Sequence, residues 1–176
     1  MVEGDGPPLR KVGVLIVDGN RHMRNILRGI VTAFGAKSVI EAADGADALR
    51  ELKHFAADIV ITDYAMSPID GIELARFIRA GKDWADRFVP ILMVSGCTDR
   101  RTVEAARDAG VNDFLAKPVS ATSLQARLCN LVFRPRSYVV TASYCGPDRR
   151  RRTLGWKGVE RRKAAVGAVT TRSRAG

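Results

Sequence analysis

Short runs of apolar residues recur between residues 12 and 133, and each is followed by a stretch with helical spacing of apolar residues. The runs are VGVLIV (12–17), SVIEA (38–42), DIVITD (58–63), PILMVS (90–95) and DFLAK (113–117). Because they are continuous rather than alternating, they predict strands of a parallel sheet covered on both faces. The stretches between them include MRNILRGIVTAF and GIELARFIRA, which predict amphipathic helices. We therefore expect five βα units in a doubly wound α/β domain.

Polar residues stand at the ends of four predicted strands, namely Asp18, Asp63, Ser95 and Lys117. The carboxyl ends of parallel strands share one edge of a sheet, where ligands bind in doubly wound domains. We expect two carboxylates, a hydroxyl and an ammonium to meet at this edge. Each residue alone could be a helix cap or a solvated surface group, but the set of four favours a functional site.

These segments resemble the receiver domain of two-component response regulators, the CheY-like fold. The matching segments are VLIVDGNRHMR, DIVITDYAMSPIDGIEL, ILMVSG and FLAKPV, and the resemblance spans residues 11–134. It implies a flavodoxin-like sheet of five parallel strands in the order 2-1-3-4-5. It also implies a signalling module that is not an enzyme and that receives its phosphoryl group from a histidine kinase or a phosphotransfer protein.

The resemblance assigns roles by position. Asp63 takes the place of the aspartate that accepts the phosphoryl group, and Lys117, followed by Pro118, takes that of the lysine that pairs with the phosphoryl oxygens. Ser95 and Phe114 take the places of the switch hydroxyl and the switch aromatic residue. The set makes chemical sense, because a carboxylate attacks phosphorus only where cations offset the charge of the donor phosphate.

One position departs from the family pattern. The resemblance implies Mg²⁺ ligands from the carboxylates of Asp18 and Asp63 and the carbonyl of Ala65, but Gly19 stands where the family usually carries a second acid. Mg²⁺ demands near-octahedral oxygen coordination. Loss of one acidic ligand therefore predicts weak Mg²⁺ binding and impaired phosphorylation of Asp63, and it favours a receiver that acts mainly as a docking module.

Composition indicates the cellular setting. Apolar residues make up 46% of the 176 residues and charged residues 27%, which is ordinary for a globular protein. The N-terminal apolar run is too short for a signal peptide, and no stretch approaches the ~18 apolar residues of a membrane span. Three cysteines without CxxC spacing do not indicate a disulfide framework or a zinc site. We expect a cytoplasmic protein.

The net charge of +10 is unevenly distributed. Residues 1–134 carry 18 basic and 17 acidic groups, whereas residues 135–176 carry 11 basic and 2 acidic groups. We therefore expect a flexible N-terminus (1–10), a receiver (11–134) and a basic tail (135–176) that is largely disordered without ligand. Within the tail, SYVVTASYCG (137–146) predicts a short strand, and no core-forming pattern follows Gly146. Such a tail implies an anionic partner.

The tail contains the pattern Gly-x-acid-Arg-Arg twice, and we call each copy a cassette. The first cassette is residues 146–150, the second is residues 158–162, and Trp156 lies between them. Arginine contacts O6 and N7 of guanine, and a carboxylate accepts hydrogen bonds from N1–H and N2–H₂. Aromatic rings stack on bases. Two cassettes therefore suit a ligand with two guanines and two phosphates.

The segment YCGPDRRRRTLGWKGVERR resembles the arginine-rich extension of the CheY-like cyclic-di-GMP effectors (Cle proteins). The resemblance covers receiver and tail. It implies that the tail binds cyclic-di-GMP and that the protein is recruited to the flagellar motor switch, where it alters motility or surface attachment. The primary ligand contacts expected are Tyr144, Asp148, Arg149, Arg150, Trp156, Arg161 and Arg162, and the secondary ones are Arg151, Arg152 and Glu160.

Two other interpretations remain open. The chain could be a phosphorylation-controlled response regulator whose basic tail binds nucleic acid or a membrane surface nonspecifically, or a phosphotransfer intermediate whose tail adds solubility. Specific DNA recognition by a helix-turn-helix is excluded, because the tail lacks amphipathic periodicity. Nonspecific binding falls steeply with salt and ignores base identity, which separates it from guanine recognition.

Overall fold

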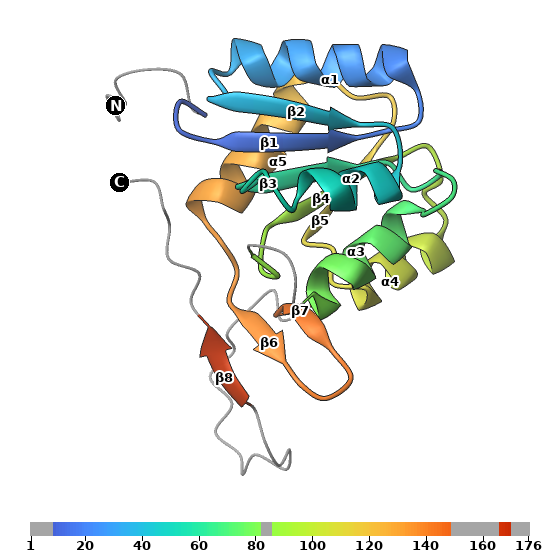
Figure 1. Cartoon of the computed structure of the whole chain (residues 1–176), viewed down its shortest axis with the longest axis vertical. Coiled ribbons are helices and arrows are strands. Elements are labelled where there is room, and N and C mark those ends of the chain that lie inside the picture. The colour runs from blue at the N-terminus through green and yellow to red at the C-terminus, as the bar shows by residue number, and fades with distance from the viewer. Residues whose placement is uncertain (1–8, 82–85, 149–165, 170–176) are drawn as a thin grey trace.

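The computed structural model describes residues 9–81, 86–148 and 166–169. All five predicted strands are present, and together they form one parallel sheet in the order β2-β1-β3-β4-β5. This order confirms the predicted doubly wound, flavodoxin-like fold (Figure 1). The strands are β1 (Gly13–Val17), β2 (Ser38–Ala42), β3 (Ile59–Thr62), β4 (Ile91–Ser95) and β5 (Asp113–Ala116).

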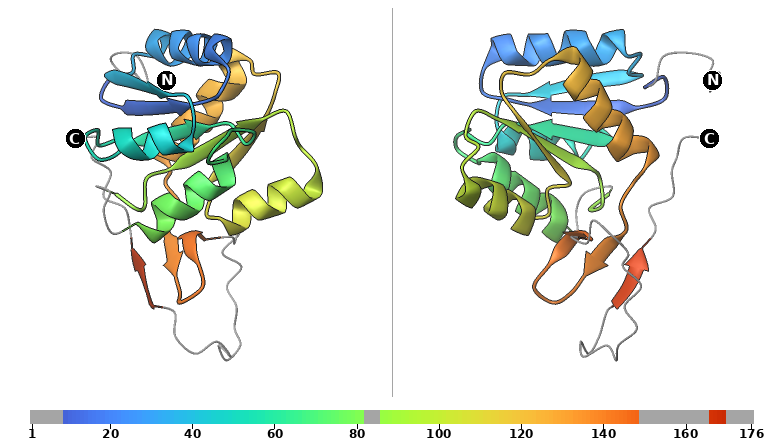
Figure 2. Two further views of the ribbon diagram at one scale, coloured as in Figure 1. Left: turned by 45° about the vertical axis from the view of Figure 1, so that its right-hand side comes forward. Right: turned by 180° about the vertical axis from the view of Figure 1, so that it is seen from behind.

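Helices follow the strands and cover both faces of the sheet, with α1 and α5 on one face and α2, α3 and α4 on the other (Figure 2). Each begins at a polar side chain that accepts backbone N–H groups of the first turn. At α3, for example, Asp70 and Glu73 form a reciprocal capping box. The helices are α1 (Arg21–Ala33), α2 (Gly45–Glu51), α3 (Gly71–Ala80), α4 (Arg100–Asp108) and α5 (Ala121–Phe133).

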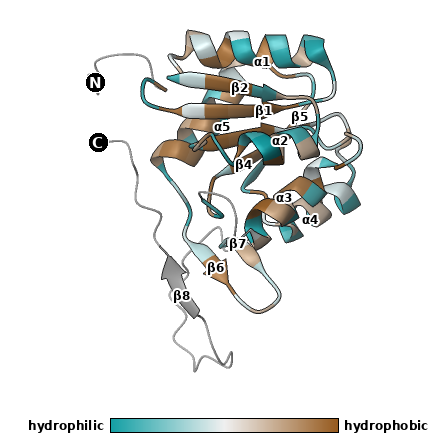
Figure 3. Cartoon of the chain, viewed as in Figure 1, coloured by the Kyte–Doolittle hydropathy of each residue, from teal (hydrophilic) through white to brown (hydrophobic). Residues whose placement is uncertain are grey.

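The sheet separates two apolar cores. Along β1, Val14 and Ile16 pack with α1 and α5, whereas Leu15 and Val17 pack with α2 and α3. Because both faces are covered, the inner strands are buried along their whole length and are mostly apolar, as Figure 3 shows by colour. This double burial explains why the strands appear in the sequence as continuous apolar runs. In the described part of the chain, no helix combines the length and the apolar character that crossing a bilayer requires.

The packed body begins before the boundary expected at residue 11. Leu9 is only 1% exposed, and its backbone N–H donates to the carbonyl of Phe34 at 2.9 Å. Val12 in turn donates to the carbonyl of Leu9. The expected flexible N-terminus therefore differs from the structure at its last residues, since a single leucine after Pro7-Pro8 is too short a pattern to predict burial.

The packed body also continues past the boundary expected at residue 134. Two short antiparallel strands, β6 (Tyr138–Val140) and β7 (Cys145–Pro147), form a hairpin that lies against the ends of α3 and α4 (Figure 1). A further strand, β8 (Val166–Val169), pairs with the other edge of β6, so the second sheet has the order β7-β6-β8. The sequence predicted one short strand here and no packing after Gly146. The structure shows a hairpin with buried Gly146 and Pro147.

Two glycines bring the hairpin into direct contact with the turn between α4 and β5. A Cβ on Gly146 would lie 2.8 Å from the Cα of Gly110, and a Cβ on Gly110 would lie 2.6 Å from the carbonyl oxygen of Cys145. Gly110 also has a φ of +92°, which side chains rarely adopt. The hairpin is therefore seated by backbone contact, which hydrophobic patterning does not reveal.

A buried polar group, which we call the anchor cluster, joins the hairpin to the receiver. It consists of Arg79 of α3, Asn112 before β5 and Tyr138 of β6 (Arg79 is 3% exposed and Tyr138 1%). The side chain of Asn112 donates to the hydroxyl of Tyr138 at 2.9 Å and accepts from Arg79 at 2.8 Å. The guanidinium of Arg79 lies 5.3 Å from the centre of the Tyr138 ring. The first strand after α5 is thus part of the receiver core.

Candidate functional site

Three of the four predicted rim residues meet at the carboxyl edge of the sheet. The Nζ of Lys117 lies 2.9 Å from Oδ2 of Asp18 and 3.2 Å from Oδ2 of Asp63. These residues follow β5, β1 and β3 directly, so the strand order brings them together from distant parts of the sequence. The rim therefore contains two carboxylates bridged by one ammonium group.

Backbone donors hold the two carboxylates in place. Asp18 is 2% exposed, and its Oδ1 accepts from the N–H of Asn20 at 2.7 Å. Oδ1 of Asp63 accepts from the N–H of Tyr64 at 2.8 Å. Gly71 packs against Asp63 so closely that a Cβ there would lie 2.0 Å from the Asp63 carbonyl oxygen. The position of Asp63 is thus set by neighbours that admit no larger residue.

The environment of Lys117 keeps it charged. Partial burial by itself lowers the pKa of Lys117, but the hydrogen bond to Asp18 and the charges of Asp63 and Asp18 outweigh this effect. The pKa therefore stands above its ordinary value. The Lys117–Pro118 peptide bond is cis. The rim thus presents a permanent cation to anything that binds between its carboxylates.

The remaining rim residue and the predicted aromatic residue lie on β4 and β5. Ser95 ends β4 and is 1% exposed, and its Oγ accepts from the N–H of Cys97 at 3.0 Å. Phe114 pairs with Met93 in the sheet and packs, half-buried, against the core beneath α3 and α4. Both therefore lie where the sequence placed them, at the end of β4 and on β5.

The donor set fits a divalent cation held by two carboxylates. A carboxylate oxygen carries two acceptor sites, so Asp18 and Asp63 keep acceptor capacity beyond the hydrogen bonds described above. Ala65 is exposed and lies in a bend two residues after Asp63. No group of three or more acidic, histidine or cysteine side chains that could hold a metal occurs within the described ranges. The arrangement fits Mg²⁺ with fewer acidic ligands than the family pattern provides.

Gly19 leaves room for the missing acid. The nearest atom to a Cβ built there is the carbonyl oxygen of Ala43, at 3.8 Å, and Gly19 is exposed. A larger side chain therefore meets no obstacle at this position. The absence of an acid beside Asp18 is a property of the sequence and is not imposed by packing.

Two of the predicted ligand-binding residues belong to the hairpin. The hydroxyl of Tyr144 donates to the carbonyl of Pro147 at 2.9 Å, and the N–H of Asp148 donates to the carbonyl of Ser137 at 2.7 Å. The other predicted contacts lie outside the described residues, namely Arg149, Arg150, Trp156, Arg161 and Arg162, together with Arg151, Arg152 and Glu160.

Sequence reasoning missed a groove between α4 and the hairpin, which we call the hairpin groove. Its lining includes Val103, Arg107, Phe114, Arg136, Tyr144 and Asp148. It missed the anchor cluster as well. One signal was available: Arg79 occupies a position on the apolar stripe of its helix, seven residues after Ile72 and four after Ala75.

Comparison with known proteins agrees with this geometry. The model of the response regulator receiver domain matches residues 14–129. The chain belongs to the response regulator receiver family. Residues 130–176, which contain the hairpin and both cassettes, lie beyond the matched receiver.

Relatives of this receiver include chemotaxis proteins. Chemotaxis protein CheY-3 of Vibrio cholerae is 34% identical over 119 residues, which cover 68% of this chain and 90% of the relative. Chemotaxis protein CheY of Pseudomonas aeruginosa is 35% identical over 115 residues, which cover 65% and 91%.

Solved structures support the same assignment. CheY4 of Vibrio cholerae has a TM-score of 0.62 at 27% identity, covering 66% of this chain and 95% of that one. The receiver domain of the sensor histidine kinase PA1611 from Pseudomonas aeruginosa has a TM-score of 0.60 at 28% identity, covering 68% and 94%. That structure holds a magnesium ion in its active-site cleft. The present chain is thus a receiver of two-component signalling.

Proposed function

We propose that this receiver is a signalling adaptor whose arginine-rich tail binds cyclic-di-GMP and which then acts on a protein partner in the cytoplasm. The observation that carries the proposal is that the first cassette starts within a hairpin fixed to the receiver. Gly146 is packed against Gly110, and Asp148 is held by the carbonyl of Ser137. Ligand contacts near this cassette would therefore be made beside the receiver surface, where a partner protein can respond to them.

The receiver rim accepts a phosphoryl group on Asp63 in this proposal. A carboxylate oxygen of Asp63 attacks the phosphorus of the donor, forming an O–P bond while the bond from phosphorus to the donor breaks. Lys117, 3.2 Å from Asp63, pairs with the transferred phosphoryl oxygens. Ser95, at the end of the neighbouring strand, donates a hydrogen bond from its hydroxyl group to them. A histidine kinase or a phosphotransfer protein is the donor, and the chain has no enzymatic turnover of its own.

Mg²⁺ bound by Asp18, Asp63 and the carbonyl of Ala65 would supply charge compensation for the donor phosphate. The magnesium ion in the PA1611 receiver supports this assignment. Gly19 leaves the site one acid short, so this chain needs more Mg²⁺ for the same occupancy. Phosphorylation is therefore the weaker of two inputs, and the messenger is the stronger.

The flagellar motor switch is the proposed partner. Two relatives are chemotaxis proteins by name, and the resemblance of the tail to Cle proteins points to the same assembly. Cyclic-di-GMP binding should increase capture of a purified switch protein by the full chain. Equal capture with and without the messenger would exclude the motor from the proposal.

Calorimetry with the full chain and two dinucleotides tests the ligand. We expect cyclic-di-GMP to bind at least about tenfold more tightly than cyclic-di-AMP at moderate salt, because adenine presents a donor where guanine presents O6. Arg149→Ala combined with Arg161→Ala should abolish binding. The control, Arg172→Ala with Arg174→Ala, removes the same two charges outside the cassettes and should bind nearly as the wild type does.

Equal affinity for the two dinucleotides would overturn the guanine-binding proposal. Steep loss of binding with salt together with displacement by heparin would instead support the alternative, a phosphorylation-controlled regulator whose basic tail binds nucleic acid or membrane nonspecifically. The charge of residues 135–176, with 11 basic and 2 acidic groups, is the observation that favours this alternative.

A further inference from the structure

We propose that the hairpin groove is the receiver's own wall of the cyclic-di-GMP site and that it takes one guanylate half of the ligand. The inference rests on the proposed function and adds residues that the arginine cassettes do not contain. Its ligand chemistry is a planar purine on an apolar floor, with an anionic phosphate at a cationic rim.

The floor of the groove comes from the receiver. Val103 of α4 is 37% exposed, which few large apolar side chains of the described residues are. Phe114 of β5 is half-buried and lines the same groove. Pro147 closes the groove from the hairpin side. These side chains offer a hydrophobic surface on which a purine ring gains by burial and stacking.

The rim of the groove carries the charges that a guanylate requires. Arg107 in the last turn of α4 and Arg136 before β6 are both exposed and both line it. The nearby carboxylate of Asp113 is already paired with Arg127 of α5 at 2.9 Å, so it opposes an incoming phosphate less. Within the part of the chain that the structure describes, the ion pair of Arg107 is with its chain neighbour Asp108, at 3.2 Å and with both side chains about half exposed. Such an exposed pair is weak.

The groove is continuous with the first cassette. Asp148 lines it and is the acid of the sequence Gly-Pro-Asp-Arg-Arg. Its backbone is held by Ser137, so this acid enters the site from a fixed position. A guanine on the floor of the groove presents its N1–H and N2–H₂ edge to a carboxylate. The groove and the acid of the first cassette therefore form one continuous recognition surface.

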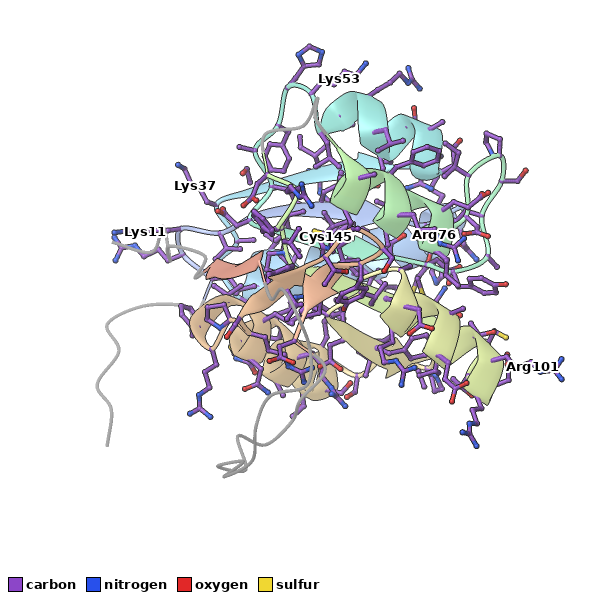
Figure 4. The ribbon with its side chains drawn as sticks, turned by 90° about the horizontal axis from the view of Figure 1, so that it is seen from below. Lys11, Lys37, Lys53, Arg76, Arg101 and Cys145 are labelled. Atoms are coloured by element: carbon purple, nitrogen blue, oxygen red, sulfur yellow. The ribbon has the colours of Figure 1, made fainter. Side chains whose placement is uncertain are left out.

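A matched pair of arginines on one helix tests this inference in the full-length chain. Arg107→Ala removes a charge that lines the groove, whereas Arg101→Ala removes the same charge from the exposed far end of α4, where Figure 4 shows its side chain directed away from the hairpin. We expect Arg107→Ala to weaken cyclic-di-GMP binding about tenfold. Arg101→Ala should change it less than about twofold, and Arg136→Ala should behave as Arg107→Ala does.

A second measurement does not depend on charge. On addition of cyclic-di-GMP, the methyl resonances of Val103 and Val111 should shift in nuclear magnetic resonance spectra, because both residues line the groove. If the wild type prefers guanine but Arg107→Ala binds as Arg101→Ala does and these methyl groups do not shift, the groove is overturned and the proposed function stands. If the wild type shows no preference for guanine, the proposed function fails and the groove fails with it.

Discussion

Two cations, the buried Arg79 and the partly buried Lys117, lie at opposite ends of the same sheet and are stabilised in different ways. Lys117 follows β5 at the carboxyl edge, where two carboxylates lie within 3.2 Å of its ammonium group. Arg79 lies beside Asn112, which precedes β5 at the amino edge. In the described ranges, no carboxylate pairs with Arg79.

Neutral acceptors satisfy Arg79 completely. Its five N–H groups donate to the carbonyls of Gly110, Arg87 and Val89, to the side chain of Asn112 and to the hydroxyl of Tyr138. Burial lowers the pKa of Arg79, and the neighbouring tyrosine hydroxyl and thiol groups counteract this only in part.

The two ends of the sheet differ in their unused hydrogen-bonding capacity. The Arg79 end is closed, with every donor used and almost no exposed surface. At the other end, the Lys117 side chain is 20% exposed, so another anion can contact its ammonium group. The carboxylates beside it retain acceptor sites. A buried charge is therefore not evidence of a reactive site by itself. Access and unused hydrogen-bonding capacity are the features that matter.

Truncation of Arg79 in the anchor cluster should have the largest effect on stability. Arg79→Ala removes the donors to three buried or partly buried carbonyls and one donor to Asn112, so we expect the free energy of unfolding to fall by about 3–5 kcal/mol. Arg76→Ala is the matched control, because Arg76 is an exposed arginine on the same helix (Figure 4). It should change stability by less than about 0.5 kcal/mol. Urea unfolding followed by circular dichroism measures both, and equal losses would refute the distinction.

Removal of the Tyr138 hydroxyl from the anchor cluster should have an intermediate effect on stability. Tyr138→Phe removes the hydroxyl that accepts from the buried Nδ2 of Asn112 at 2.9 Å and should reduce stability by about 2 kcal/mol. Burial raises the pKa of Tyr138, which the charge of Arg79 opposes only in part. The folded state therefore favours the neutral phenol, and this contribution to stability is lost as pH rises above about 10. The wild type should lose stability there more steeply than Tyr138→Phe, and parallel pH profiles of unfolding would contradict this.

Addition of an acid beside Asp18, at the Lys117 end of the sheet, should have the smallest effect and should strengthen Mg²⁺ binding. Gly19→Asp places an acid in open space beside Asp18 and should tighten Mg²⁺ binding about tenfold. The measurement is the Mg²⁺ concentration needed for a phosphate analogue to bind. Gly29→Asp, at an exposed position of α1 that also has free space, adds the same charge away from the rim and serves as control. Ordinary Mg²⁺ dependence in the wild type would show that the missing acid does not limit the site.

The sequence predicted the open end better than the closed one for a physical reason. The apolar composition of the runs that form β1 to β5 predicts that they are buried. The polar residues at the ends of these strands meet at one edge once the strands align. Asp18, Asp63 and Lys117 therefore followed from local patterns and one topological rule.

The closed end could not be predicted in this way. The hydroxyl of buried Tyr138 accepts from Asn112 and Arg79, which lie 26 and 59 residues earlier in the chain. Gly146 packs because Gly110 lacks a side chain, which is a property of a pair and not of either residue. The same limit applies to the hairpin groove, since Arg107 and Arg136 become neighbours of Asp148 only through the docking of the hairpin.

The pairing of β8 with β6 has a consequence for any ligand of the arginine-rich segment. β7 and β8 flank the same strand, so the chain between Asp148 and Val166 departs from and returns to one small sheet. The two ends of this segment are therefore held at one sheet, and the entropy of bringing them together is lost when the protein folds. A messenger that binds the segment between these strands would therefore cost less chain entropy than one that binds a segment attached at one end only. It would also contact a segment that is joined to the receiver at both ends.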